Sequence, residues 1–395
     1  MSSSSPPTNR AILLSSFTTP ATLTTTPTLP SVPANTGTVL LRVLSTPIVP
    51  YASAIHAGHL TGLNLPPRLP LIPNANGIAR VVTPPPDAFY LKKDQLVYID
   101  CTIRARDDTL QPPMPINIVG HFAGTPGDAA VESFVNERSP WKDGTLQDHI
   151  VLPLENVYPL DEDRLIKELG YTIASLNSLT YYTVAAGAII EAGGVKTGET
   201  VVIGPVGGSF GGAAVELALA LGAGRVVVLG RHEQKLKEMR ERLGGDRVEY
   251  VVMSGDSDAD AQEIIKKTPG GKGADVYNDW TPGALEAAPY LDAGVKSLVK
   301  RGRVILSGGP RGNLVIPYAV AVLRDLKIVG KSMFSRETAN YVIKLVEQGI
   351  LDVGRKGKGA DVDVKEFGLE ELQDALKDAE GGGWRKYTVV SPNAN

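Results

Sequence analysis

The stretch VVIGPVGGSFGG, residues 201–212, indicates how the second half of this sequence folds. It opens with a β-branched run, passes through a turn of small residues and leads into the apolar helical pattern AAVELALALG. A strand, a glycine-rich turn and a helix in this order start a nucleotide-binding βαβ unit, whose helix N-terminus offers free N–H groups to phosphate. The same letters contain G-x-S-x-G at residues 207–211, the spacing of a nucleophilic serine in many hydrolases. Both interpretations are open at this point.

Short strand-like runs alternate with helical patterns from about residue 166 onward. The runs are TVVIG, RVVVLG, VEYVVM, GADVYNDW, GRVILSGG and LKIVGKSM, and the helical segments between them include EQKLKEMRERLG and DAQEIIKKTP. This alternation predicts a parallel sheet with crossover helices, that is, a doubly wound α/β domain. ANYVIKLVEQG and LEELQDALKDAE predict two late helices, and the final strand WRKYTVVS has no partner in the α/β pattern. We expect that strand to return to the first domain.

Short apolar runs interrupted by Pro and Gly fill the first half of the chain and predict an all-β domain. They include RAILLSS, TVLLRVLS, NGIARVVT, QLVYID and LQDHIVLP. The Thr- and Pro-rich residues 18–30 predict an exposed, extended connection between the first two strands. Residues 102–143 are irregular and long enough to be a functional lobe or a mobile surface excursion. The predicted domains are residues 1–165 together with 335–395, and residues 166–334.

Composition and charge argue against several classes of function. The 395 residues are 43% hydrophobic and 21% charged, and the net charge of -3 gives no electrostatic reason to expect nucleic acid or an anionic membrane as a partner. The single cysteine, Cys101, rules out an intramolecular disulfide and a multi-thiolate zinc site. The N-terminus lacks the basic start and apolar core of a signal peptide, and no run reaches the ~18 consecutive apolar residues of a membrane span. We therefore expect a cytoplasmic protein.

The glycine loop departs in one place from the strict G-x-G-x-x-G pattern. Counting back from the helix places the third glycine at Gly211, the second at Gly208 and the first position at Val206. Six consecutive loop residues are therefore the expected contacts of a dinucleotide diphosphate: Val206, Gly207, Gly208, Ser209, Phe210 and Gly211.

The end of the next strand indicates which dinucleotide binds. The position that reads the ribose is Gly230, and Arg231 follows it. An acidic residue there would accept hydrogen bonds from a 2'-hydroxyl, whereas Gly followed by Arg leaves room and positive charge for a 2'-phosphate. The segment predicts NADPH as the cofactor, with Lys235 as a further cation.

The serine hydrolase interpretation fails on the order of the triad. An elbow serine needs an acid and then a histidine later in the chain. Only one of the five histidines follows Ser209, and it lies next to Arg231 in the predicted ribose-binding turn. The histidines are His56, His59, His121, His149 and His232. The loop is therefore interpreted as a phosphate cradle.

Several motifs together resemble the medium-chain dehydrogenase/reductase superfamily over nearly the whole chain. TGTVLLRVLSTPIVP is similar to its second strand and active-site entry, LPLIPNANGIARVV to its P-G-x-E-G-x-G segment, and SLTYYTVAAG to its domain-crossing helix. RGRVILSGG and GKSMFSRE resemble its last sheet strands. The resemblance implies a GroES-like β domain beside a Rossmann domain, with the active site between them. By the same likeness we expect a small-molecule substrate and a homodimer.

The sequence departs from the zinc alcohol dehydrogenases of that superfamily at the metal site. Those relatives carry a cysteine in the strand near Val49, and a histidine and a glutamate where this chain has Ala75 and Asn76. Alanine has no ligand atom, and asparagine is a poor zinc ligand. The four-cysteine structural lobe is also absent from the sequence. The chain therefore resembles the zinc-independent branch of quinone oxidoreductases and enoyl reductases, for which we expect no metal ligands.

Hydride transfer to an enone without a metal needs other hydrogen-bond donors. Negative charge develops on the carbonyl oxygen, and the α-carbon must receive a proton. The stretch VPYASAIHAGH offers three candidate donors, Tyr51, His56 and His59.

Three residues complete the expected cofactor-binding set. Thr180, in SLTYY, matches a position that contacts the nicotinamide in relatives, although a hydroxyl bonded to its own helix backbone is the alternative. Phe334 is expected to pack near the cofactor ring or to belong to the core. Gly308 lies at the end of the strand RGRVILSGG, on the expected cofactor side of the sheet.

The leading hypothesis is an NADPH-dependent reductase of an activated C=C bond in an enone, enal or quinone. Metal-free reduction of a carbonyl, or oxidation of an alcohol, is the first alternative on the same fold. A non-catalytic NADPH-binding protein is a more distant one, because the glycine loop and Arg231 would bind the cofactor even without chemistry. Fold-level likeness alone does not choose between them.

Overall fold

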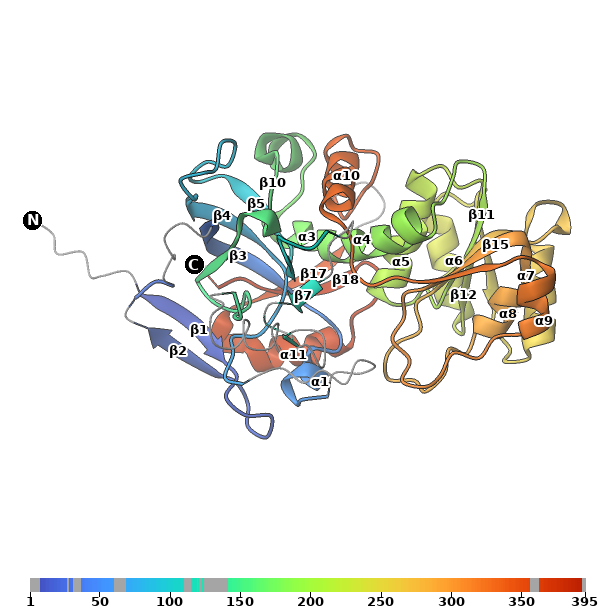
Figure 1. The fold of residues 1–395 in the computed structure, drawn as a ribbon, viewed down its shortest axis with the longest axis horizontal. Helices are drawn as coiled ribbons and strands as arrows, with labels where there is room; N and C mark the ends of the chain where they lie inside the picture. Colours follow the sequence, from blue (N-terminus) through green and yellow to red (C-terminus); the bar gives the residue numbers. More distant parts are fainter. Residues whose placement is uncertain are drawn as a thin grey trace, which may run out of the picture.

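The computed structural model describes residues 8–26, 28–30, 37–59, 69–109, 115–118, 120, 122–123, 141–355 and 362–392. Figure 1 shows two halves along the long axis of the molecule, a β-rich half that holds both chain ends and an α/β half at the other end. This is the α/β fold with a mixed sheet and a parallel Rossmann-like sheet that the sequence predicts.

The α/β half is a six-stranded parallel sheet with helices on its faces. The strand order is β13-β12-β11-β14-β15-β16. Strands up to β13 are added on one side of β11 and strands from β14 onward on the other, so the switch point lies between β11 and β14. Dinucleotides bind outside the carboxyl ends of the strands at such a switch point. The strands are β11 (Thr200–Gly204), β12 (Arg225–Gly230), β13 (Val248–Val252), β14 (Ala274–Asp279), β15 (Leu298–Leu306) and β16 (Lys327–Gly330). The helices are α5 (Ser209–Ala220), α6 (Glu233–Arg242), α7 (Ser257–Lys266), α8 (Leu291–Lys296) and α9 (Tyr318–Leu323), with a 3-10 turn at η5 (Pro269–Gly271).

The apolar runs of the α/β half are continuous because the central strands are covered on both faces. Every residue of β11 is buried, and so are the four middle residues of β12. A strand covered on both sides needs side chains of one kind throughout, which explains why TVVIG and RVVVLG show no alternation. The expectation of a parallel doubly wound sheet is confirmed.

The β-rich half is built on a mixed sheet of order β10-β5-β4-β3-β18-β17, in which β9 also pairs with β3. Its members from the first half of the chain are β3 (Thr38–Ile48), β4 (Gly77–Thr83), β5 (Leu96–Ile99), β9 (His149–Pro153) and β10 (Val157–Pro159). Short helical turns flank it at α1 (Ala52–His56), η2 (Leu154–Asn156) and η3 (Asp163–Glu168). The last strand, β18 (Lys386–Val390), pairs antiparallel with β3, so the chain end returns to this sheet as expected.

The Thr- and Pro-rich connection is extended and mostly exposed as predicted, but part of it is a paired strand that the sequence analysis did not predict. β2 (Thr22–Thr26) pairs antiparallel with β1 (Asn9–Leu13) in a separate two-stranded sheet. The Thr24 hydroxyl also donates to the Ala11 carbonyl. Threonine is β-branched and favours a pleated strand once a partner is available, and the adjacent prolines hid this preference.

The irregular region 102–143 begins as a small three-stranded sheet. Its strands are β6 (Thr102–Arg104), β7 (Pro115–Ile118) and β8 (Phe122–Ala123). Residues 110–114 and 124–140, and with them His121, lie outside the described residues. The choice between a functional lobe and a surface excursion therefore stays a prediction.

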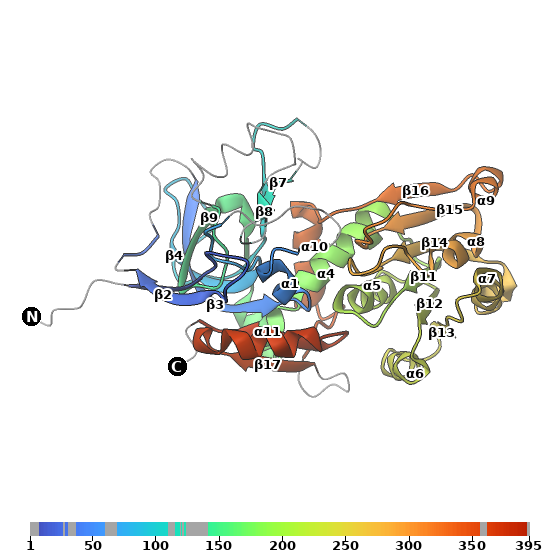
Figure 2. The ribbon, with the colours of Figure 1, turned by 90° about the horizontal axis from the view of Figure 1, so that it is seen from below.

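Helices cross between the two halves. The forward crossing runs through α3 (Ile173–Leu176), α4 (Leu179–Ala186) and the π-helix η4 (Gly187–Ala192), and Figure 2 shows α4 between the two sheets. Residues 173–192 are long and apolar enough to span a membrane. However, 78% of their apolar stretch is buried inside the protein, so these residues form part of the core. The return path contains α10 (Arg336–Glu347), β17 (Asp363–Phe367), η6 (Leu369–Glu371) and α11 (Leu372–Glu380).

Candidate active site at the glycine loop

The glycines of the loop after β11 have two different physical roles. A Cβ on Gly211 would lie 2.3 Å from the Pro205 carbonyl oxygen, so this glycine lets α5 pack against the loop. Gly207 and Gly208 are exposed, and a Cβ on either would meet no atom within 4 Å. Packing therefore does not require glycine at these two positions. The open space above them is where a ligand can approach the backbone closely.

The N-terminus of α5 is free to bind an anion. Gly208 is its N-cap in an extended conformation, with φ -85° and ψ 165°, and no side chain caps the helix. The first N–H groups of a helix have no intrahelical acceptor and carry the positive end of the helix dipole. Open glycines before an uncapped helix fit the diphosphate of a dinucleotide. Val206 is buried below the loop and fills core.

Ser209 is not arranged as a nucleophile. Its side chain is buried, and its hydroxyl donates a hydrogen bond of 3.0 Å to the carbonyl oxygen of Gly383. A nucleophilic serine instead donates to a base that removes its proton. The geometry agrees with the rejection of the hydrolase interpretation.

The end of β12 presents uncompensated positive charge. Arg231 and Lys235 are exposed, and neither has an ion-pair partner within the part of the chain that the structure describes. Arg231 lies close enough to Tyr290 to oppose the rise in the pKa of its phenol that burial causes. A Cβ on Gly230 would be 3.1 Å from Leu236 Cδ2, which explains the small residue at this turn.

Thr180 lies in a buried polar layer between the two halves. Its hydroxyl has no hydrogen-bond partner of good geometry among the described residues, although it is near enough to the Tyr98 phenol to lower its pKa. The Asn177 Oδ1 atom, three residues earlier, is also unpaired, while its Nδ2 donates to Ser45 Oγ at 2.8 Å. Both unpaired atoms are closed from solvent in this conformation. Contact between Thr180 and a nicotinamide therefore stays a prediction.

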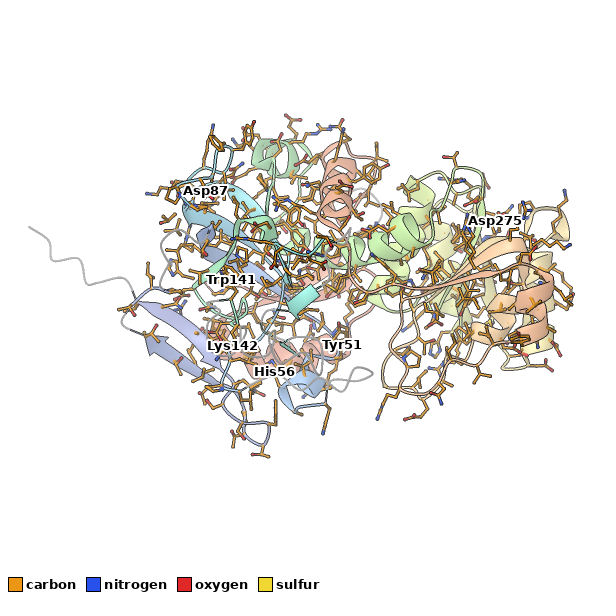
Figure 3. The ribbon with its side chains drawn as sticks, in the orientation of Figure 1. Tyr51, His56, Asp87, Trp141, Lys142 and Asp275 are labelled. Atoms are coloured by element: carbon orange, nitrogen blue, oxygen red, sulfur yellow. The ribbon has the colours of Figure 1, made fainter. Side chains whose placement is uncertain are left out.

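The three candidate proton donors lie on or beside α1 but differ in environment. Tyr51 precedes the helix, and Figure 3 shows it nearer the nucleotide-binding half than His56. Burial of its hydroxyl raises the pKa of Tyr51 to about 12, although 43% of the residue remains exposed. Burial lowers the pKa of His56 to about 4, so its imidazole is neutral at pH 7. His59 is exposed.

A row of aromatic rings connects Tyr51's surroundings with the glycine loop, and the sequence did not reveal it. Tyr181 stacks on Tyr387 with ring centroids 4.8 Å apart and meets the edge of Phe210 at 5.2 Å. Phe210 in turn stacks on Trp280 at 5.8 Å with an interplanar angle of 10°. The charge of Tyr51 would raise the pKa of Tyr181, which places the two phenols near each other. The rings come from four distant segments, so no local pattern predicts the row.

Gly308 and Phe334 have clear packing roles. A Cβ on Gly308 would lie 2.5 Å from the Thr281 carbonyl oxygen, so glycine allows the turn after β15 to approach the turn after β14. Phe334 is buried, its ring lies 6.0 Å below the Arg104 guanidinium, and its carbonyl accepts a hydrogen bond from the same group. Cofactor contact by either residue stays a prediction.

The residues at the expected metal position do not fit a zinc ion. Val49 and Ala75 are buried and have no ligand atom. The amide nitrogen of Asn76 donates to the Tyr98 hydroxyl and to the Ile99 carbonyl, both at 3.1 Å. Among the described residues, no three His, Cys, Asp or Glu side chains gather as metal ligands would.

Comparisons with known proteins agree with this architecture. Residues 210–348 match the family of zinc-binding dehydrogenases. This match covers about a third of the chain and lies in the α/β half and the start of the return path. An alcohol dehydrogenase of Geobacillus stearothermophilus is 32% identical over 156 residues, 40% of this chain and 42% of that protein. The acryloyl-coenzyme A reductase of Sulfurisphaera tokodaii is 29% identical over 163 residues, 41% of this chain and 43% of that protein. These alignments span less than half of either curated relative.

Solved dehydrogenase structures share the whole fold. The crystal structure of an alcohol dehydrogenase from Thermotoga maritima superposes with a TM-score of 0.75 over 98% of this chain and all of that one, at 20% identity. At this identity the likeness defines the fold and leaves the reaction open. Relatives named for different reactions, an alcohol dehydrogenase and an acryloyl-coenzyme A reductase, both match part of this chain.

Proposed function

We propose that this chain is an NADPH-dependent oxidoreductase that transfers hydride to an activated C=C bond of an enone, enal or quinone without a zinc ion. The observation that carries the proposal is the chemistry at positions 75 and 76: Ala75 has no ligand atom, and the Asn76 amide nitrogen donates to Tyr98 and Ile99. Carbonyl polarisation then depends on protein hydrogen-bond donors.

The cofactor would be held at its diphosphate and at its 2'-phosphate. The N–H groups at the start of α5 bind the diphosphate, and Gly207 and Gly208 leave room for it. Arg231 supplies the charge for a 2'-phosphate, and Lys235 adds to the local positive field. NADPH, when bound, supplies the hydride.

Tyr51 is the proposed donor to the substrate. A phenol is protonated at neutral pH, and burial raises the pKa of Tyr51 further, to about 12, so its O–H can donate a hydrogen bond to a carbonyl oxygen as negative charge develops there. His56 is neutral at the same pH and is not a cationic acid. The aromatic row behind Tyr51 keeps water away from the reacting atoms and favours a flat, conjugated substrate.

Product analysis with an enone tests the reaction directly. NADPH oxidation is first measured against a panel of enones, enals and quinones, with NADH as the comparison. A saturated ketone supports the proposal, whereas an allylic alcohol shows that the enzyme is a metal-free carbonyl reductase. Tight NADPH binding with no turnover across the panel would instead favour a non-catalytic binding protein.

We also propose that the protein is a homodimer formed through the β16 edge of the parallel sheet. β16 is the last strand in the sheet order, and Figure 2 shows it along the upper edge of the α/β half, with α9 at the far end of that edge. Val315, Tyr318 and Leu323 beside it are 77%, 81% and 73% exposed. An apolar patch beside an open sheet edge favours a protein interface. Light scattering after gel filtration should give twice the monomer mass, and a monomeric wild type would contradict this.

The cytoplasm is the proposed location. Cys101 is buried and free, and burial raises the pKa of its thiol to about 12, so no disulfide chemistry contributes to the described structure. Proteins without disulfides are usual in reducing compartments. A fluorescent fusion found in secretory compartments would contradict this location.

A further inference from the structure

A buried carboxylate on the phosphate-binding helix is bonded entirely to other elements. Glu216 of α5 accepts a hydrogen bond of 2.9 Å from the Tyr182 hydroxyl of α4. It also forms a two-pronged pair with Arg385, with Nε at 2.9 Å and Nη2 at 2.7 Å. The Trp384 indole N–H donates to the same carboxylate. The Glu216 and Arg385 side chains are only 5% and 4% exposed.

Burying this pair needs an explanation beyond stability. Removing two charges from water costs about as much as their attraction returns, so a buried ion pair contributes little compared with apolar side chains. Its bonds are directional, however, and they fix the relative position of the groups that carry them. Arg385 also adopts φ +55°, a left-handed conformation that is unfavourable for a residue with a side chain.

The segment that contains Arg385 touches the glycine loop on both sides. Residues 381–385, which join α11 to β18, are called here the covering segment. The backbone N–H of Trp384 donates to the Gly207 carbonyl at 3.1 Å. The carbonyl of Gly383 accepts a hydrogen bond of 3.0 Å from the Ser209 hydroxyl. The Trp384 ring packs so closely on Gly212 that a Cβ there would lie 2.1 Å from its Cδ1 atom.

The covering segment continues into the sheet of the other half. β18 follows it directly and pairs with β3, the strand that ends just before Tyr51. The Arg385 guanidinium also donates to the Asp352 carbonyl at 3.1 Å, which adds a second link to the returning chain. The phosphate loop is thus tied to the half that carries the proposed proton donor.

We propose that Glu216 and Arg385 are positioning residues: their buried pair holds the covering segment against the glycine loop and so fixes the diphosphate-binding N–H groups relative to Tyr51. This inference rests on the proposed function, because it assigns the pair a role in holding the cofactor. Binding and hydride transfer both depend on placing groups to within about 1 Å, so a loosened segment weakens both.

The test compares three variants of the full chain with a matched control. Glu216→Gln removes the charge with little change of volume, Arg385→Lys keeps one charge without the two-pronged geometry, and Trp384→Phe removes a single N–H donor. The control is Glu199→Gln, which breaks the half-buried Arg303 pair beside the amino end of β11, away from the loop. NADPH dissociation constants, melting temperatures, kcat and KM are measured, together with hydrogen exchange of residues 205–212.

The expected result separates positioning from stability. At a temperature where all proteins are folded, Glu216→Gln should weaken NADPH binding at least tenfold and lower kcat, with Arg385→Lys intermediate. Exchange in residues 205–212 should become faster without any nucleotide. Glu199→Gln should lower the melting temperature but leave NADPH binding within twofold. Lower melting temperatures with unchanged binding and unchanged exchange would overturn the inference.

The same measurements distinguish failure of the inference from failure of the proposed function. If the wild type binds NADPH but reduces no enone, the proposed reaction is wrong, while the dissociation constants still test the pair. If the wild type binds neither NADPH nor NADH, the cofactor proposal and the positioning role are both overturned. Trp384→Phe keeps the buried ion pair and removes only the indole N–H bond to Glu216. It can therefore still test the covering segment if Glu216→Gln or Arg385→Lys fails to fold.

Discussion

Substituting Gly208 by alanine should strengthen the fold and weaken cofactor binding. The residue has φ -85° and ψ 165°, which alanine adopts without strain, and the new Cβ would meet no protein atom within 4 Å. Replacing glycine by alanine at a compatible position stabilises a protein by about 0.4–1 kcal/mol, because the unfolded chain loses freedom. The methyl group nevertheless occupies the space through which a diphosphate reaches the helix N–H groups.

The loss of affinity follows from the cost of overpacking. Inserting a methyl group into a filled contact costs about 1–3 kcal/mol, which corresponds to a roughly 5- to 150-fold higher dissociation constant for NADPH. The predicted changes in stability and binding therefore have opposite signs. A general disturbance of the fold would lower both.

The assay combines denaturant unfolding without ligand and an NADPH titration followed by fluorescence. Trp280 and Trp384 both lie beside the loop and report on occupancy. Gly330→Ala is the matched control, because this glycine is also open and lies three strands from β11, about 14 Å away by strand spacing. It should not alter binding. The reasoning is refuted if Gly208→Ala binds NADPH as tightly as the wild type.

Three further predictions concern the cofactor, the donor and pH. Arg231→Asp should lose about 1.5–3 kcal/mol of preference for NADPH over NADH, measured as the ratio of the two kcat/KM values; an unchanged ratio would contradict the 2'-phosphate assignment. Tyr51→Phe should lower kcat by about 10²–10⁴-fold at unchanged cofactor affinity, and full activity would show that the donor lies elsewhere. The pKa of His56 is about 4 in the folded state and about 6.5 in the unfolded state. As the pH is lowered below 6.5, the unfolded state binds a proton before the folded state does, so the free energy of unfolding decreases. Urea unfolding of His56→Gln should therefore show about 2 kcal/mol less loss than the wild type between pH 7 and pH 5, and equal losses would argue against a buried neutral imidazole.

Local patterns were sufficient for the elements and class of the fold. Strand and helix periods differ, and glycine turns separate them, so the order of elements from residue 200 onward could be read before the structure was known. The two glycine roles were also visible, because a phosphate loop needs small residues at fixed distances from a helix start. The exception was β2, where pairing with β1 outweighed the breaking effect of nearby prolines.

The sequence by itself determined the parallel sheet, the glycine-rich loop before a helix and the residue types at positions 75 and 76, since each depends on residue type at a local spacing. Only the tertiary structure decided which distant groups surround that loop. Glu216 and Arg385 are 169 residues apart, and Phe210 and Trp280 belong to different crossover units. Long-range contacts of this kind depend on how whole elements pack, and packing leaves no periodic trace in the chain. The environment that raises the pKa of Tyr51 and lowers that of His56 likewise exists only after folding has removed water from α1.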